Sequence, residues 1–406
     1  MDSYSDARSL PIRWRHVLLR LLDVRNLPDL ILLSAVILVQ AAGAALLLWG
    51  PAGVRLLRLR WAVIAGTLFS AVLPMLGFLL RFARVNHFFP PWWSGWGRGL
   101  IFAWAFLSVF LVAAILISRR WLRAQSGHSP ARRAFLHTTQ AALICTPAIV
   151  TGYAVFIQRL NLSLREQDLM FPDLPQDLHG LRIVQLTDIH LSPYLPEHVL
   201  ARAVDMANET RAHLALVTGD LISTERDPLD TCLRQLSRLR ADAGIFGCLG
   251  NHEMYTNSED YVEQQGARMG HRYLRRRSQP LKFGQATLNL AGVDYQSSGK
   301  PYLVGAERMV APDAFNVLLS HNPDVFPVAA RKGYRLTIAG HTHGGQVRVE
   351  ILHRDLSFAR FFTPYVDGLY RRDQAAIFVS RGIGTIALPA RLGAPPEVNL
   401  LRLCRT

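Results

Sequence analysis

Four long apolar stretches constrain the first 157 residues of the chain more than any other feature. They span about residues 30–49, 61–80, 100–118 and 135–157, and none contains an internal Asp, Glu, Lys or Arg. Because a helix needs roughly 20 apolar residues to cross the hydrocarbon layer, we predict a membrane domain of four transmembrane helices in residues 1–157. A buried bundle in a soluble protein is the alternative, and it fits four apolar runs between Arg-rich loops less well.

The positive charge of the chain is concentrated in the same region. The formal net charge is +15, and residues 1–134 contain 16 Arg, no Lys and four acids. A nucleic-acid site would need its cations clustered on a folded domain. We therefore expect the lipid bilayer as a partner and no nucleic acid. The run Arg275-Arg276-Arg277 in the second half is interpreted as a solvated turn or helix end.

Sidedness depends on weaker signals, because the Arg counts of the loops on alternate sides of the four stretches are equal. The segment Arg132-Arg133-Ala134-Phe135-Leu136 resembles a twin-arginine export signal. We expect a multi-pass protein of the inner cell membrane with its second half outside the cytoplasm. A cytoplasmic placement is the alternative, because an Arg pair at the membrane surface is equally typical of an ordinary helix end.

Beyond a polar segment at 158–180, interpreted as a linker, short apolar runs alternate with helical patterns. A helix is expected at 197–213, and strands are expected at 181–187, 214–218, 245–249, 288–293, 316–320, 336–339 and 376–380. Strands that alternate with helices indicate layered α/β structure. We predict one such domain over residues 181–406.

Five short polar clusters follow the predicted strands in order. They are Asp188-Ile189-His190, Gly219-Asp220, Gly250-Asn251-His252-Glu253, Ser320-His321-Asn322 and Gly340-His341-Thr342-His343. In layered α/β sheets the loops after the strands converge at one edge, and sites form there. We therefore expect residues as far apart in sequence as Asp188 and His343 to meet.

These side chains are the kinds that bind divalent metals. Asp188 and His190 are two residues apart, so on an extended strand end they would point the same way. Asp220 has two oxygens and could bridge two ions, and Asn251 offers an amide oxygen. His321, His341 and His343 add three imidazoles. A mixed O/N set without thiolate suits Mn, Fe, Zn or Co, and the four scattered cysteines form neither a zinc knuckle nor a disulfide framework.

Two further residues beside Asn251 have candidate roles. His252 would lie over the site and could act as general acid, because imidazole titrates near working pH. Glu253 has two interpretations. It could orient His252 from behind, or it could be a helix-start carboxylate near the positive end of the helix dipole.

The ordered clusters closely resemble the calcineurin-like metallophosphoesterases. The string Gly340-His341-Thr342-His343-Gly344-Gly345-Gln346 is similar to the bacterial branch with membrane-attached or exported members, and a four-span N-terminus is similar to transmembrane metallophosphoesterases. The resemblance implies a four-layer α/β/β/α sandwich and His252 as proton donor. It also implies two metal ions, one held by Asp188, His190, Asp220 and His343, and one held by Asp220, Asn251, His321 and His341.

We therefore predict a membrane-anchored phosphoesterase that hydrolyses a phosphodiester or a lipid-linked phosphoester by attack of a hydroxide bridging two metal ions. Leu352, Phe358, Phe361 and Phe362 would form an apolar rim for acyl chains or would pack within the core or a loop. The alternative function is a metal-dependent sensor, scaffold or transport-associated module without turnover. The four apolar stretches lack the internal charges expected of an ion pathway, which favours a simple anchor.

Overall fold

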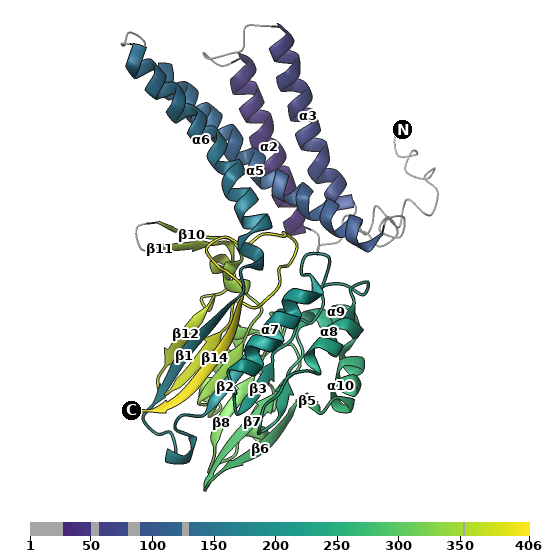
Figure 1. The fold of residues 1–406 in the computed structure, drawn as a ribbon, viewed down its shortest axis with the longest axis vertical. Helices are drawn as coiled ribbons and strands as arrows, with labels where there is room; N and C mark the ends of the chain where they lie inside the picture. Colours follow the sequence, from purple (N-terminus) through teal and green to yellow (C-terminus); the bar gives the residue numbers. More distant parts are fainter. Residues whose placement is uncertain (1–26, 50–56, 80–89, 124–129, 352–353) are drawn as a thin grey trace, which may run out of the picture. The chain divides into compact units, whose positions relative to one another are not determined.

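The computed structural model describes residues 27–49, 57–79, 90–123, 130–351 and 354–406 (Figure 1). The chain divides into two compact units. The helical unit comprises the described parts of Met1–Phe88 and Leu100–Val150, and the sheet unit comprises those of Phe89–Gly99 and Thr151–Thr406. The second unit thus includes the start of one long helix and the end of another.

Each apolar stretch forms a helix: α2 (Leu27–Trp49), α3 (Leu57–Leu79), α5 (Pro91–Arg123) and α6 (Pro130–Phe156). Gly95–Ser118 and Ala134–Leu160 are long and apolar enough to cross a membrane, and only 22% and 11% of their most apolar windows are buried. In α2 and α3 the described apolar segments are shorter, Leu33–Trp49 and Arg60–Leu73. The structure therefore supports four helices, two of which meet the length and composition required of a span.

The sheet unit contains two six-stranded mixed sheets. The first has the order β1-β14-β2-β3-β4-β5 and the second β12-β13-β9-β8-β7-β6, with a separate β10-β11 hairpin. The strands are β1 (Ser163–Phe171), β2 (Arg182–Leu186), β3 (Leu214–Val217), β4 (Ile245–Gly247), β5 (His271–Tyr273), β6 (Arg277–Phe283), β7 (Ala286–Gly292), β8 (Phe315–Leu319), β9 (Leu336–Ala339), β10 (Arg348–Ile351), β11 (Arg354–Ser357), β12 (Gly368–Arg372), β13 (Ala375–Val379) and β14 (Glu397–Arg405).

Both sheets are parallel at their centres. Strands β2 to β5 run parallel, and so do β7, β8, β9 and β13. Antiparallel pairs lie towards the edges, where β14 joins β2, β6 joins β7 and β12 joins β13. The carboxyl ends of the central strands therefore gather at a common edge of each sheet.

The helices and the core give the unit its layers. The helices are α7 (Glu197–Glu209), α8 (Leu229–Leu236), α9 (Asn251–Tyr255), α10 (Glu259–Arg268) and α11 (Phe326–Arg331), and short 3₁₀ turns are η3 (Gln158–Leu160), η4 (Gln176–Leu178), η5 (Ala306–Met309), η6 (Pro323–Val325), η7 (His343–Gly345) and η8 (Phe358–Phe361). One buried cluster fills the space between the sheets and includes Phe246 and Phe378. Apolar residues of α7, α8 and α10 pack on the first sheet, and those of η5 and α11 pack on the second. The order is α/β/β/α.

The seven expected strands all occur within about two residues of their expected bounds. The segment 158–180, which we expected to be a linker, contains η3, β1 and η4. Strand β1 pairs in parallel with β14 over the whole of Ser163–Phe171. Its residues Leu169 and Phe171 are fully buried, whereas most of its other residues are polar and are exposed or half-buried. The sheet unit therefore begins before residue 181.

Candidate metal centre

The clusters meet where the sequence predicts, in the loops after β2, β3, β4, β8 and β9. The seven expected ligands are Asp188, His190, Asp220, Asn251, His321, His341 and His343, and all but the half-buried His341 are buried. Their ligand atoms form overlapping groups in which all atoms lie within 4.8 Å of one another: Asp188 with His190 and His343, and Asp220 with His321 and His341. The groups contain six of the seven predicted ligands, and the seventh, Asn251, is a buried residue at the start of α9.

Short distances join these groups. His190 Nε2 lies 3.2 Å from His343 Nε2 and 3.4 Å from Asp220 Oδ2. His321 Nε2 lies 3.0 Å from the same Asp220 Oδ2. Asp220 thus lies between the two groups, as a carboxylate that bridges two ions would. His252 forms a further group with His190 and Asp220, in which the ligand atoms again lie within 4.8 Å of one another, so it lies beside the centre.

The backbone at the centre is strained. Asp188, His190, Asp220, His341 and His343 all have positive φ, between 45° and 77°. L-residues other than Gly rarely adopt this region, and such conformations cost on the order of 1–3 kcal/mol each where the surroundings enforce them. The sequence argument assumed extended backbone at the i, i+2 pairs, and the structure corrects it. His341 and His343 point into different groups because each turns through the left-handed region.

Hydrogen bonds from neighbouring backbone hold the two carboxylates. The backbone N–H of His341 donates to both oxygens of Asp188 at 2.9 and 3.0 Å, and Thr187 Oγ1 donates to Oδ2. Asp220 Oδ1 accepts the backbone N–H of His252 at 2.9 Å. Each carboxylate therefore ties its own strand end to another cluster and keeps the remaining lone pairs free.

The outer ring nitrogens of the histidines have partners that fix how the rings are oriented. His321 Nδ1 donates to the carbonyl of Thr218 at 2.7 Å, and His252 Nδ1 donates to that of Ser223 at 2.8 Å. His190 Nδ1 lies 3.0 Å from Ser223 Oγ. Such bonds leave Nε2 facing inward, which is the arrangement of metal-binding histidines. The Ser223 loop supports two of them and was not singled out from the sequence.

One inward atom shows that a divalent metal fits this set. Asn251 Oδ1 is buried and lacks a hydrogen-bond partner among the described residues. Buried polar atoms without partners cost about 1–3 kcal/mol, and a cation supplies the missing interaction. Oxygen and imidazole donors without thiolate match Mn, Fe, Zn or Co.

The buried carboxylates and imidazoles of the centre shift one another's pKa values. Burial raises the pKa of Asp188. For Asp220, burial alone would also raise the pKa, but the facing His321 and His190 bring it well below the usual value. For His321, burial lowers the pKa, whereas Asp220 and Asp188 together raise it to about 10. Burial lowers the pKa of His341 to about 3. The pocket therefore stabilises positive charge between its carboxylates and keeps a neutral imidazole beside it.

Glu253 follows the helix-start interpretation. Its carboxylate is fully buried and accepts the backbone N–H groups of Asp220, Leu221 and Gly250 at 2.7 to 2.9 Å. The partner of His252 is the Ser223 carbonyl. Glu253 thus fixes the Asp220 loop against the start of α9 and acts on the centre through the backbone.

Arg391 was missed by sequence reasoning and is fully buried. Its guanidinium donates to the carbonyls of Gly384, Ala394, Arg381 and Gly382 and lies 3.5 Å from the Nδ1 and the carbonyl oxygen of His343. Burial lowers its pKa to about 10. A lone Arg in an irregular C-terminal segment has no sequence signal that marks it as buried.

The ends of both candidate spans pack on loops of this centre, within the sheet unit. Trp96 Nε1 donates to the carbonyl of Pro193 at 2.9 Å, and the Tyr194 hydroxyl donates to the carbonyl of Gly95 at 2.7 Å. Pro193 and Tyr194 follow His190 by three and four residues. Arg159 lies over the Trp96 ring and donates to the Tyr194 carbonyl. The backbone N–H of Arg391 donates to Ala154 at 3.1 Å.

Comparisons with known proteins agree with the sequence resemblance. Residues 181–345 match the family model described as calcineurin-like phosphoesterase. The metallophosphoesterase YkuE of Bacillus subtilis is 28% identical over 63% of this chain and 90% of its own length. A phosphodiesterase of Escherichia coli, YaeI, is 26% identical over 67% of this chain and 98% of its own.

A transmembrane protein with a metallophosphoesterase domain from Danio rerio is also similar. It is 26% identical over 68% of this chain, and the match spans 65% of the Danio rerio protein.

Proposed function

We propose that this chain, which carries a calcineurin-like phosphoesterase domain, is a membrane-anchored hydrolase of phosphoesters that uses two divalent metal ions. The observation that carries the proposal is the convergence of seven carboxylate and imidazole side chains, Asp220 and His252 among them, into overlapping groups. Asn251 Oδ1 is buried and lacks a hydrogen-bond partner among the described residues. The similar proteins YkuE and YaeI are named a metallophosphoesterase and a phosphodiesterase, which agrees with this chemistry.

The ligand assignment extends the two groups by Asp220 and Asn251, as the family resemblance implies. We assign Asp188, His190, Asp220 and His343 to one ion and Asp220, Asn251, His321 and His341 to the other. Two such ions, of Mn, Fe, Zn or Co, supply Lewis acidity and an activated water for attack on phosphorus. The strained loops hold the ligands close together, and a backbone fixed in this way lowers the cost of binding ions and substrate.

His252 is assigned as the proton donor to the departing oxygen. Its ring lies at 4.7 Å between centroids from the ring of His190, and its Nδ1 is held by the Ser223 carbonyl. This leaves Nε2 to carry a proton on the substrate side. Burial lowers the pKa of His252 to about 4, so substrate phosphoryl charge must stabilise the protonated ring.

The membrane part of the proposal comes from the helices and from an apolar surface near His341. Phe358, Phe361 and Phe362 are 66%, 85% and 71% exposed, so they do not pack in a core, and Leu352 lies outside the described residues. Phe362 and Thr363 line a cavity of about 250 Å³ together with Asn322 and His341. Exposed aromatic clusters mark membrane or ligand contacts. We therefore favour a lipid-linked phosphoester or phosphodiester.

Purified full-length protein tests the proposal directly. Elemental analysis should find about two divalent metal ions per chain, and bis(p-nitrophenyl) phosphate or a lipid phosphodiester in mixed micelles should be hydrolysed. His252→Gln should keep the metal and lose most of the rate. Metal-loaded, folded protein with no turnover across phosphomonoesters and diesters would favour the sensor or scaffold instead.

We further propose four membrane spans, with the phosphoesterase domain outside the cytoplasm. The twin-arginine-like segment at Arg132 and Arg133 lies at the start of α6 and supports this sidedness. An alkaline phosphatase reporter fused after Thr406 should be active. A silent reporter beside a fluorescent cytoplasmic fusion would reverse the assignment.

A further inference from the structure

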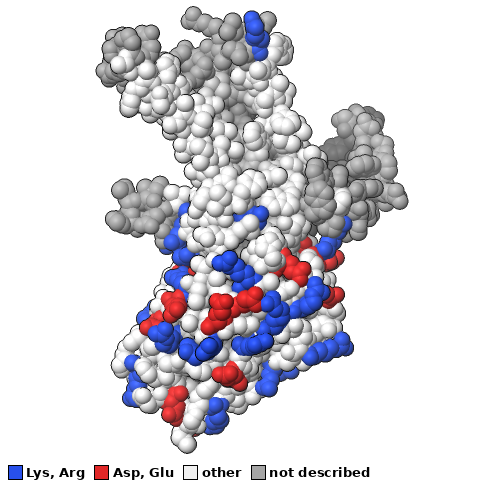
Figure 2. All heavy atoms as spheres, viewed as in Figure 1, with Lys and Arg blue, Asp and Glu red and all other residues white. Residues whose placement is uncertain are grey.

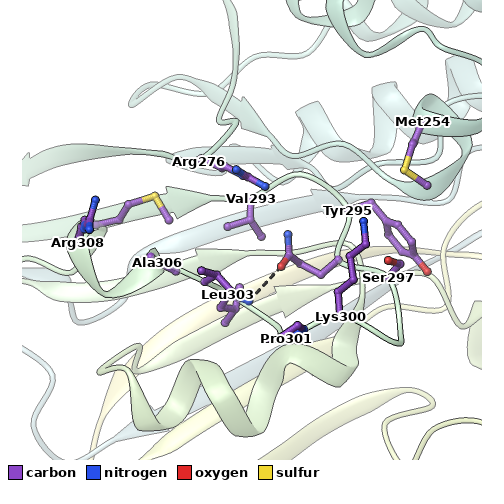
Figure 3. A pocket seen from close by; sticks show the side chains of 14 residues that line it. Met254, Arg276, Val293, Tyr295, Ser297, Lys300, Pro301, Leu303, Ala306 and Arg308 are labelled. Atoms are coloured by element: carbon purple, nitrogen blue, oxygen red, sulfur yellow. Dashed lines mark hydrogen bonds between the residues drawn. The ribbon is translucent and has the colours of Figure 1, made fainter.

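A second cavity lies beside the centre and has its own chemistry. It has a volume of about 680 Å³, within the range of small-molecule sites. Figure 3 shows Tyr295 and Met254 at one end and Arg308 at the other. Three cations, Arg276, Lys300 and Arg308, line it with the apolar residues Val293 and Leu303, and its lining contains no acid.

The three cations have no ion pair within the described part of the chain, and all are exposed. The contrast with their neighbours is informative. Arg275 pairs with Asp260, Glu263 and Asp294, and Arg277 pairs with Glu263. Residues 275–277 were expected to form a solvated turn or helix end. Two of these arginines instead form ion pairs with acids, and only Arg276 lines the cavity.

The cavity adjoins the metal centre through Tyr295. Its ring centroid lies 5.5 Å from that of His341 and 6.3 Å from that of His321. Met254, at the same end, follows His252 by two residues in α9. A molecule with a phosphoryl group at the centre could therefore extend past Tyr295 into the cavity.

The cavity loop is fixed to the ligand-bearing segment after β8. Asn322, which follows His321 and is 3% exposed, donates to the carbonyl of Gln296 at 2.6 Å. Gln296 Oε1 in turn accepts the backbone N–H of Leu303 at 3.0 Å. These bonds fix the distance between the cavity and the metal centre. The cavity and the centre can therefore recognise two separate groups on one ligand.

We propose that this cavity binds a second anionic group of the substrate, so that the enzyme selects phosphodiesters in which one alcohol carries a further phosphate, phosphonate or carboxylate. The inference rests on the proposed phosphoesterase activity. The apolar floor accommodates the uncharged spacer, and the three unpaired cations supply the electrostatic complementarity that favours such a ligand.

Two matched probes test the proposal on the full-length, metal-loaded protein. One is ethyl p-nitrophenyl phosphate, and the other is its 2-phosphonoethyl counterpart, which releases the same p-nitrophenol. We expect a KM about ten-fold lower for the phosphonate probe, since each partly exposed ion pair contributes modestly. The variant R276Q/K300Q/R308Q should raise that KM to the ethyl value and leave turnover of the ethyl probe unchanged.

A control variant of equal charge separates the cavity from the overall field. R202Q/R240Q/R372Q removes three exposed cations outside the cavity, and it should keep the preference. Isothermal titration calorimetry with 2-phosphonoethyl phosphate measures the affinity of the cavity independently of turnover. Hydrolysis of both probes with equal KM would overturn the cavity assignment and leave the phosphoesterase intact. Cavity-dependent binding without any hydrolysis would support the cavity and overturn the proposed function.

Discussion

The helical unit and the sheet unit bury different kinds of polar group. In the helical unit neutral side chains pair with one another: Gln40 Nε2 donates to Ser108 Oγ at 2.6 Å and Trp104 Nε1 to Ser70 Oγ at 2.9 Å. On the face drawn in Figure 2, the described side chains of that unit are almost all uncharged, whereas Lys, Arg, Asp and Glu gather on the sheet unit. In the sheet unit, ionisable groups are buried, and some, such as His271, lack hydrogen-bond partners among the described residues.

This difference indicates that the helical unit has a structural role and that the sheet unit carries the reactive groups. Paired neutral groups add a little stability and specify helix packing. Buried carboxylates on left-handed backbone cost free energy, and they persist only where the surrounding fold enforces them. The substitutions below test whether the two units really differ in this way.

The largest effect should come from Asp220→Ala. In the proposed ligand assignment both ions share this residue, and its carboxylate lies in the two groups that contain His252 and His321. Its loss should therefore abolish retention of metal and reduce turnover by far more than the roughly 10- to 100-fold typical of outer-shell changes. Elemental analysis and the rate with bis(p-nitrophenyl) phosphate check this. His252→Ala is the matched comparison and should keep its metal. Equal metal loss in both variants would contradict the division of roles.

Arg391→Met should have the next largest effect. The substitution preserves length but leaves the carbonyls around Gly384 and the ring of His343 without their donor. Each buried acceptor left without a donor costs about 1–3 kcal/mol. We expect a large drop in the free energy of unfolding and a 10- to 100-fold weaker affinity for Mn²⁺. Arg391→Lys should recover only part, because Lys cannot form a planar fork.

Asp220 was predicted from the sequence, whereas Arg391 was not, and the difference has a physical reason. The ligands could be predicted because each follows an apolar strand, and strand ends meet. Arg391, Ser223 and Tyr295 could not, since each acts from an irregular loop whose position depends on tertiary packing. Strand β1 was missed because its two faces each mix polar and apolar residues, so no alternation is visible in the sequence. Its pairing with β14 also joins segments at opposite ends of the unit.

A smaller, pH-dependent effect is expected at His271 in β5. Its side chain is 2% exposed, both ring nitrogens lack partners among the described residues, and burial lowers its pKa to about 4. The unfolded chain therefore binds the proton more readily, so stability falls as the pH drops below about 6.5 towards 4. His271→Leu should remove about 1–2 kcal/mol of the loss between pH 7 and pH 5. Denaturation at both pH values measures it, with the exposed His198→Leu as control.

The smallest effect should arise in the helical unit, from Gln40→Leu. Its hydrogen bond to Ser108 joins α2 to α5, and such bonds between apolar helices contribute only about 0.6 kcal/mol on average. We expect a slightly lower thermal midpoint in detergent and unchanged kcat and metal content. Ser108→Ala should give a similar value, and the double variant should cost little more than either change. If Gln40→Leu instead impaired metal retention, the helices would be part of the chemistry, and the contrast between the two units would fail.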